Sequence, residues 1–150
     1  MSTYYPFIAA LSANIIAQIL KPIIARIVNG KWHLLMAKDS GGFPSSHTAA
    51  VVSLMIAIGI QDGVNSSVFA LSFVFALIVC YDAANVRYYA GQNIQVTQQL
   101  IKDIEAITKV EFNNPLYLKQ IKQVLGHKWI EVFGGVIVGL LVACVLSLFR

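Results

Sequence analysis

Four apolar stretches alternate with polar ones along the chain and predict its main helices. They cover residues 4–20, 48–60, 67–86 and 129–149. A helix that crosses a bilayer needs about 20 apolar residues, so the 13 residues of the second stretch are few. We expect that helix to be short or shielded by its neighbours. The pattern predicts an all-α integral-membrane bundle of about four transmembrane helices, built as one domain over residues 1–150.

Residues that break helices mark the connections. Lys21-Pro22 predicts a break or kink after the first stretch, because proline lacks the N–H group that an inner helical turn uses, although a weaker helical pattern continues to residue 28. Turns are predicted at Asn29-Gly30 and over residues 61–66. Arg87 is expected to end the third helix. In the long connection that follows, apolar residues recur at helical spacing through 92–107, and a second short helix is predicted over 116–125. The bundle should therefore carry a short amphipathic helical insertion between its third and fourth membrane helices.

The composition places the chain in a membrane. Hydrophobic residues make up 57% and charged residues 12%, whereas soluble chains carry about 25% charged residues. Cys80 and Cys144 both lie in apolar stretches, which indicates small core residues rather than a disulfide or a metal site. The sequence has no tight histidine or cysteine spacing typical of zinc ligands, so we predict no metal and no cofactor.

The net charge of +4 is spread over separate lysines and arginines rather than an arginine-rich run. Anionic headgroups of membrane lipids account for these residues better than nucleic acid does. Ten of the 11 basic residues lie in the connections 21–38 and 87–128. With four crossings these two connections share one face, which the positive-inside rule assigns to the cytoplasmic side of the cell membrane, with both termini outside.

The first candidate site opens the second helix. The Gly-Gly-Phe-Pro sequence of residues 41–44 predicts a tight turn that delivers Ser45, Ser46 and His47 to the first helical turn. Serine is a preferred N-cap, and a helix N-terminus offers unpaired N–H groups and a positive dipole end to an anion. Two hydroxyl groups and an imidazole there could bind and protonate a phosphate group. A capped helix with an incidental histidine explains the same residues equally well.

The second candidate site opens the fourth helix, where His127 and Glu131 are four residues apart and share a face. A carboxylate can accept one imidazole N–H and leave the other nitrogen free to attack. A solvated ion pair at the helix end is the alternative, although a glutamate inside an apolar helix is costly unless paired. By the crossing argument His47 lies at the same face, so one histidine could attack phosphorus while the other protonates the leaving alcohol.

Two further features bear on this site. Asp82 and Arg87 either form a structural ion pair that holds the third helix in the bundle, or Arg87 binds phosphate and Asp82 supports it. In the fourth helix, Gly135 and Gly139 have the spacing of a face that packs closely against another helix.

Three motifs together resemble a known family. They are Gly-Gly-Phe-Pro-Ser-Ser-His over residues 41–47, Tyr-Asp-Ala-Ala-Asn-Val-Arg over 81–87, and Leu-Gly-His-x-x-x-Glu-Val-Phe-Gly-Gly over 125–135. They look like the divergent branch of the type 2 phosphatidic acid phosphatase superfamily, which is related to acid phosphatases and vanadium-dependent haloperoxidases. The resemblance extends from about Gln18 to Gly139.

The resemblance implies metal-free phosphomonoester hydrolysis in a helical bundle. The superfamily's Pro-Ser-Gly-His element matches residues 44–47, which makes His47 the general acid. Its Ser-Arg-x5-His-x3-Asp element matches at His127, the nucleophile, and at Glu131, which replaces aspartate. Ser46 stands where glycine is usual, and Ile121 stands where an arginine is expected.

The superfamily's Lys-x6-Arg-Pro element is not recognisable, although Lys31 and Lys38 have its spacing. Two phosphate-clamping arginines are thus missing from their usual places. The candidates to replace them are Arg87, Lys21, Lys31 and Lys38, in addition to Ser45 and Ser46 as phosphate ligands.

These observations predict a membrane-bound, metal-independent phosphatase that hydrolyses a lipid phosphate or a small phosphate monoester at the cytoplasmic face. A non-catalytic protein that binds anionic lipid headgroups in a degenerate pocket is the first alternative, motivated by the missing arginines. A small transporter subunit is the second, motivated by polar residues within the apolar stretches. Four short helices are few for a transporter, so this alternative requires a homo-oligomer. A haloperoxidase is not expected, because that chemistry belongs to large soluble relatives.

Overall fold

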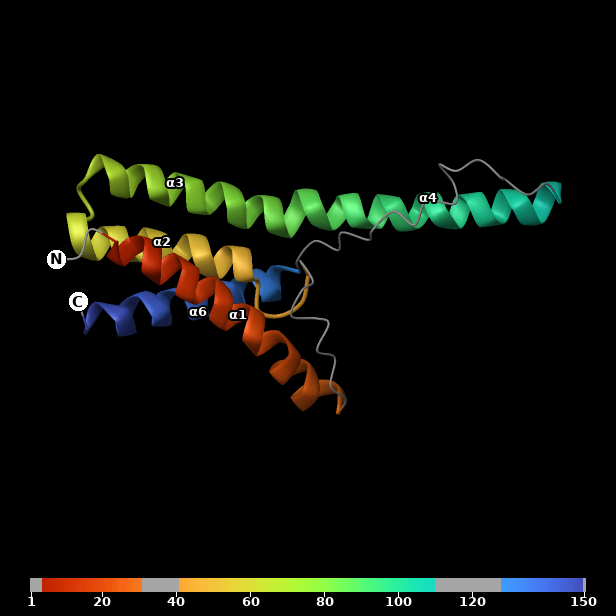
Figure 1. The fold of residues 1–150 in the computed structure, drawn as a ribbon. Coiled ribbons are helices and arrows are strands. Elements are labelled where there is room, and N and C mark those ends of the chain that lie inside the picture. The colour runs from red at the N-terminus through yellow and green to blue at the C-terminus, as the bar shows by residue number, and fades with distance from the viewer. Residues whose placement is uncertain (1–3, 31–40, 110–127, 150) are drawn as a thin grey trace.

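The computed structural model describes residues 4–30, 41–109 and 128–149 (Figure 1). These residues form helices and turns, with no strand among them, which confirms the predicted all-α class. The elements in chain order are α1 (Tyr5–Asn29), α2 (Ser46–Asp62), α3 (Ser67–Tyr81), the π-helical turn η2 (Asp82–Val86), α4 (Arg87–Thr108) and α6 (Trp129–Ser147).

Helix α1 continues through the proline that was expected to break or kink it. Pro22 lies inside the helix, which ends only at Asn29. Gly30 then takes a left-handed conformation with φ 72°, and its N–H group donates to the carbonyl of Arg26 at 3.0 Å. A positive φ favours glycine. The predicted turn at Asn29-Gly30 is therefore confirmed. Of the two outcomes predicted at Lys21-Pro22, a break or a kink, the break is wrong, because the helix is continuous there.

Helix α2 is the central helix of the bundle and packs against α1, α3 and α6. Its 17 residues give a length of about 25 Å, which is shorter than the hydrocarbon core of about 30 Å. Its buried residues include Ala49, Val52, Ser53 and Ala57. Both expectations for the second apolar stretch, that it is short and that its neighbours shield it, are met.

Small residues allow α6 to approach α2 closely. A Cβ atom on Gly135 would lie 2.5 Å from the carbonyl oxygen of Ser45, and one on Gly139 would lie 2.6 Å from the carbonyl oxygen of Ala49. Neither distance leaves room for a side chain. The predicted glycine face of the fourth helix is confirmed, and its partner is α2.

The third helix does not end at Arg87, contrary to the prediction. Helix α3 passes through η2 into α4 without interruption, and the whole covers 42 residues. At 1.5 Å per residue this is about 63 Å, longer than a bilayer with its headgroups. Figure 1 shows α4 projecting well past the other helices. The amphipathic helix of the insertion is therefore a continuation of the third helix, because one arginine among good helix formers does not stop a helix.

Among the described residues, three helices are long and apolar enough to cross a membrane: α1, the α3–α4 rod and α6. Less than a third of each apolar window is buried inside the protein, so lipid must cover most of the rest. At one end of the bundle, the Tyr5 hydroxyl donates to the carbonyl of Ala143 at 2.8 Å. At the other end, α2 and α6 begin side by side, and the candidate site lies there.

Candidate functional site

The turn before α2 is bonded directly to the first turn of α6. The backbone N–H of Ser45 donates to the backbone carbonyl of Glu131 at 2.9 Å. Gly42 provides a positive φ of 92° in this turn, and the peptide bond between Phe43 and Pro44 is cis. The two stretches that carry the candidate chemistry, far apart in sequence, therefore meet at one point, as the crossing argument predicted.

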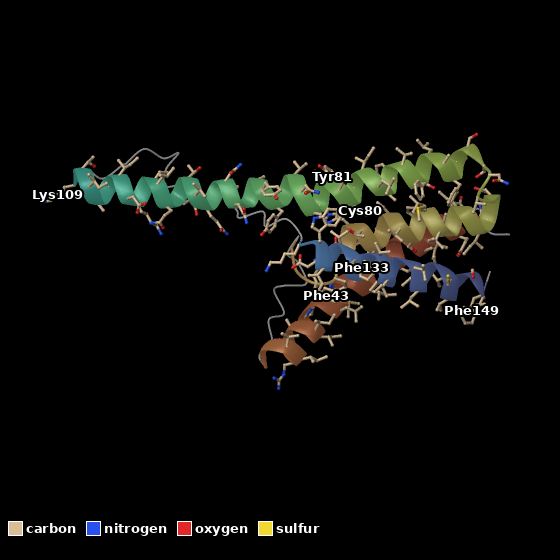
Figure 2. The ribbon with its side chains drawn as sticks, turned by 180° about the vertical axis from the view of Figure 1, so that it is seen from behind. Phe43, Cys80, Tyr81, Lys109, Phe133 and Phe149 are labelled. Atoms are coloured by element: carbon tan, nitrogen blue, oxygen red, sulfur yellow. The ribbon has the colours of Figure 1, made fainter. Side chains whose placement is uncertain are left out.

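A second glycine makes room for the turn. A Cβ atom on Gly134 would lie 2.5 Å from the ring of Phe43, so that ring lies directly on the backbone of α6. Figure 2 shows Phe43 between α6 and α1. Gly134 thus packs against the ring of Phe43, and Gly135 packs against Ser45, the N-cap residue of α2.

Ser45 and Ser46 are both fully buried. The Ser45 hydroxyl accepts the N–H of Thr48 at 3.3 Å, which makes it the N-cap of α2 as predicted. The carbonyl of Ser46 accepts the side-chain amide of Asn14 at 3.4 Å, while the Ser46 hydroxyl has no hydrogen-bond partner among the described residues. Burial shields both hydroxyl groups from water, and neither serine is among the described residues lining the cavity below.

His47 is the second residue of α2 and is partly buried. It therefore lies within the first turn, where the unpaired N–H groups and the positive end of the helix dipole are located. As the second residue of α2, directly after the buried Ser46, His47 lies at the end of the bundle where α6 begins.

The buried lysine is the most unusual feature of this end of the bundle. Lys21 is 1% exposed, and a charged side chain is almost never that deep unless the site stabilises it. It lines a cavity of about 210 Å³ together with Phe43 and Glu131. A cation and a carboxylate thus share one small cavity beside the turn. The cavity has room for a phosphate group.

Glu131 also orders the start of α6. Its carboxylate accepts the backbone N–H of Lys128, the N-cap residue, at 3.3 Å, as in a capping box. A carboxylate has further lone pairs beyond this bond, so it can still orient a histidine. Among the residues that the structure describes, no group of three or more His, Cys, Asp or Glu side chains could hold a metal ion.

The π-helical turn holds the third helix against α6 at the same end. Ala83 and Ala84 of η2 form a buried cluster with Val132 of α6. Asp82 is the first residue of the turn and is partly buried. Turns of this kind occur often at functional sites. Asp82 therefore directly precedes the two alanines that contact α6. Its two predicted roles, an ion pair with Arg87 or support of a phosphate-binding Arg87, stay predictions.

Comparison with known proteins agrees with this architecture. The family model for the Divergent PAP2 family matches residues 3–142. The chain belongs to the Divergent PAP2 family. It is also 37% identical to the uncharacterized membrane protein YuiD of Bacillus subtilis (strain 168), over 98% of this chain and 96% of that protein. No solved structure matches the chain. The resemblance read from the three motifs is thus confirmed, and a place in the membrane is supported by both the helices and the relative.

For this member of the Divergent PAP2 family, several candidate residues lie outside the described part of the chain. They are His127, Ile121, Lys31 and Lys38, together with the predicted helix over 116–125. The backbone of Arg87 is described as the first residue of α4, but its side chain is not. Their proposed roles stay predictions. His127 directly precedes Lys128, so the sequence alone ties it to the N-terminus of α6.

We did not predict the burial of Lys21, although the spacing of polar residues along the first apolar stretch of this Divergent PAP2 chain indicates it. Asn14, Gln18 and Lys21 are spaced by four and three residues, which places them on one face of α1. All three are at least partly buried. Polar residues aligned on one face of an apolar helix indicate that this face points into the protein. Lys21, the last of the three, lines the cavity.

Proposed function

We propose that the protein is a membrane-embedded, metal-independent phosphatase that acts through a phosphohistidine intermediate. The observation that supports this most directly is the hydrogen bond between Ser45 and Glu131. It brings the turn that carries His47 to the helix that follows His127, beside a cavity lined by the buried Lys21. Membership of a family related to phosphatases agrees with this chemistry.

The proposed reaction has two displacements. The neutral imidazole of His127 attacks the phosphorus atom, the bond to the ester oxygen breaks, and protonated His47 gives its proton to that oxygen. Water then attacks the phosphohistidine, His47 takes a proton from this water, and the bond between phosphorus and His127 breaks to release phosphate. Glu131 accepts the other N–H of His127 and stabilises the cationic ring that forms.

Lys21 takes the place of the clamping arginines in this proposal. Positive charge aimed at the non-bridging oxygens stabilises the charge that spreads over them during transfer. The low-dielectric surroundings of a buried lysine strengthen that interaction. Arg87, Lys31 and Lys38 are the further candidates for this role, and Asp82 supports Arg87. Ser45 and Ser46 lie at the helix N-terminus, where backbone N–H groups attract an anion.

The test is phosphate release by the detergent-purified protein from a panel of lipid phosphates and soluble esters, with EDTA present. His47→Ala and His127→Ala are assayed in parallel, and Arg26→Ala serves as a control at an exposed position. The proposal expects release that EDTA does not reduce and that both histidine variants lose. Equal release by wild type and His127→Ala would overturn it.

A non-catalytic anion-binding protein is the second candidate. The feature that favours it is the cavity, where Lys21 is the only cationic residue among the described lining residues, whereas the superfamily pattern calls for two arginines. This candidate predicts that vanadate or a lipid phosphate binds and that no phosphate is released from any substrate in the panel.

A further inference from the structure

Helix α4 leaves the bundle and carries a long exposed apolar face. Its main packing partner among the described residues is η2, and Figure 1 shows it extending past the other helices in line with α3. Six exposed positions recur along it at an average spacing of about 3.6 residues, the period of one helix face. We call them the α4 stripe: Tyr89, Asn93, Val96, Leu100, Ile104 and Ile107.

The stripe is the open side of the helix. Ile94 precedes Val96 by two residues, which turns it by about 200° around the helix axis. Ile94 and Ile101, seven residues apart on that opposite side, are both partly buried. In contrast, the five apolar members of the stripe are all exposed, with Ile107 at 81%. One side of α4 is therefore covered within the chain, and the side that carries the stripe is not.

The stripe lies beyond the hydrocarbon core of the bilayer. The 15 residues of α3 and the 5 of η2 give a length of about 30 Å, which matches the core. Tyr88 and Tyr89 follow, with their rings edge to face and 5.5 Å apart, and tyrosine is typical of the membrane interface. Val96 lies about 10 Å further along the axis, and Ile107 about 27 Å. Acyl chains do not reach these residues, so their exposure marks a contact with protein.

The charges of α4 do not suit an anionic membrane surface. Helices that lie on such surfaces are rich in lysine and arginine on their polar face. In α4 the charges cancel, because the helix carries two basic and two acidic residues: Arg87, Lys102, Asp103 and Glu105. The uninterrupted connection to α3 also directs α4 away from the bilayer rather than along it. A neutral apolar stripe of this kind fits another helix with the same properties.

We propose that the α4 stripe binds the α4 stripe of a second copy of this chain, and that the two helices run parallel. Two copies inserted into one membrane in the same orientation have α3 crossing in the same direction, so both rods emerge on the same side. Asn93 is the one polar residue of the stripe. In an in-register pair the two Asn93 side chains meet, and a single asparagine in an apolar seam sets register and favours two strands.

The spacing of the stripe suits two long, nearly straight helices. It repeats after 11 residues, from Tyr89 to Leu100 and from Val96 to Ile107. Such a repeat corresponds to about 3.67 residues per turn, close to the period of about 3.6 of a straight helix. Two copies can therefore stay in contact along the whole of α4 without strong supercoiling.

The π-helical turn joins the stripe to the exposed face of α3. The next exposed apolar residue after Tyr81 is Val86, five residues later, and a π-helical turn brings residues i and i+5 together. Val86 in turn precedes Tyr89 by three. The shared face runs along the 42-residue rod, about 63 Å. With a width of one helix, about 10 Å, it covers about 600 Å² per copy, or about 1,200 Å² in all, the lower end of stable interfaces.

The first experiment is cysteine cross-linking of the full chain in membranes, with Cys80→Ala and Cys144→Ala to remove the native thiols. Val96→Cys and Ile107→Cys lie on the stripe. Gln95→Cys and Ala106→Cys are their exposed neighbours off the stripe. Oxidation should link each stripe variant to its own copy at least five-fold faster than the neighbouring control. Both positions must link, because in an antiparallel pair only one of them could meet itself.

The second experiment measures the strength of association. Donor- and acceptor-labelled chains are mixed in phosphatidylcholine vesicles, and energy transfer is followed as the protein is diluted with lipid. Leu100→Glu places two like charges at the seam and should raise the dissociation constant at least 10-fold. Gln95→Glu, exposed off the stripe, should leave it unchanged. If Leu100→Glu fails to fold, the cross-linking variants still decide.

Energy transfer no greater than chance encounters produce would overturn the proposal, as would equal cross-linking on and off the stripe. Cross-linking at only one stripe position would reject the parallel arrangement. A monomer whose Val96→Cys resists a water-soluble maleimide would show that lipid or another part of the chain covers the stripe, and would also overturn the proposal. None of these readouts is phosphate release, so the result is independent of the proposed phosphatase activity.

Discussion

The backbone N–H of Ser45 lies 2.9 Å from the backbone carbonyl of Glu131 and donates to it. This hydrogen bond joins the N-cap of α2 to the first turn of α6, and with it the two halves of the candidate site. Both partners are main-chain groups, so the bond depends on how closely the two segments approach. The glycines that permit this approach are therefore the residues through which the site's geometry can be tested.

Gly135→Ala should destabilise the protein by about 1–3 kcal/mol, the usual cost of overpacking. Its new methyl group would lie 2.5 Å from the Ser45 carbonyl oxygen, which cannot rotate away. Gly134→Ala is the matched control, because its methyl group would meet only the movable Phe43 ring. Denaturant unfolding in detergent micelles should rank Gly135→Ala as the less stable of the two. The opposite order would contradict the close approach described for α2 and α6.

Lys21→Met should weaken vanadate binding about 10-fold or more. Methionine keeps much of the side chain's length but removes the charge, and hydrogen bonds to charged groups contribute about 1.5–3 kcal/mol. Arg26→Met, five residues further along α1 and exposed, is the control and should bind as wild type. Titration of the purified variants with orthovanadate measures both. Unchanged affinity in Lys21→Met would remove this lysine from the site.

Glu131→Gln and Glu131→Ala should separate folding from chemistry. The glutamine oxygen can still accept the N–H of Lys128, so stability should stay close to wild type, whereas alanine loses the bond and about 0.5–2 kcal/mol. Both variants should lose activity, on the order of 10²–10⁴-fold, because neither orients a histidine with a negative charge. Thermal unfolding and phosphate release are measured on the same preparations. A fully active Glu131→Gln would show that the carboxylate serves only as a cap.

The continuous α3–α4 rod predicts a defined distance between its ends. Spin labels at Val74→Cys and Gln99→Cys, both exposed, are 25 residues apart and should be separated by about 37 Å along one helix axis. Cys80→Ala and Cys144→Ala remove the native thiols. Pulsed dipolar spectroscopy gives the distance. A clearly shorter or very broad distribution would indicate that the chain breaks near Arg87 after all.

The sequence was sufficient to predict the ends of those helices that turn residues delimit. Asn29-Gly30 and the polar residues after Gln61 end α1 and α2 near the predicted positions, and the long apolar stretch gives α6 to within two residues. It was insufficient at Pro22 and Arg87. At Pro22 the helix continues although proline inside a helix costs about 3 kcal/mol, and at Arg87 it continues because arginine is a good helix former.

The candidate site was predictable in part for a similar reason. The motifs and the count of membrane crossings predicted that the start of α2 lies at the same face as the start of α6. Both depend only on the order of segments along the chain, which the sequence gives directly. The role of Lys21 in the cavity depends on how α1 rotates against both helices. That rotation is set by packing of small residues such as Ala13 and Ala17, which a single sequence indicates only weakly.

The most direct test of the central claim is to trap the phosphorylated enzyme. The protein is mixed with a radiolabelled lipid phosphate, quenched rapidly in alkali and digested, and the labelled peptide is identified. Phosphohistidine survives alkali and is lost in acid. We predict an acid-labile label on His127 that is absent from His127→Ala and that persists longer in His47→Ala, which hydrolyses it slowly. Phosphate release with no label on any histidine would contradict the mechanism proposed for this protein.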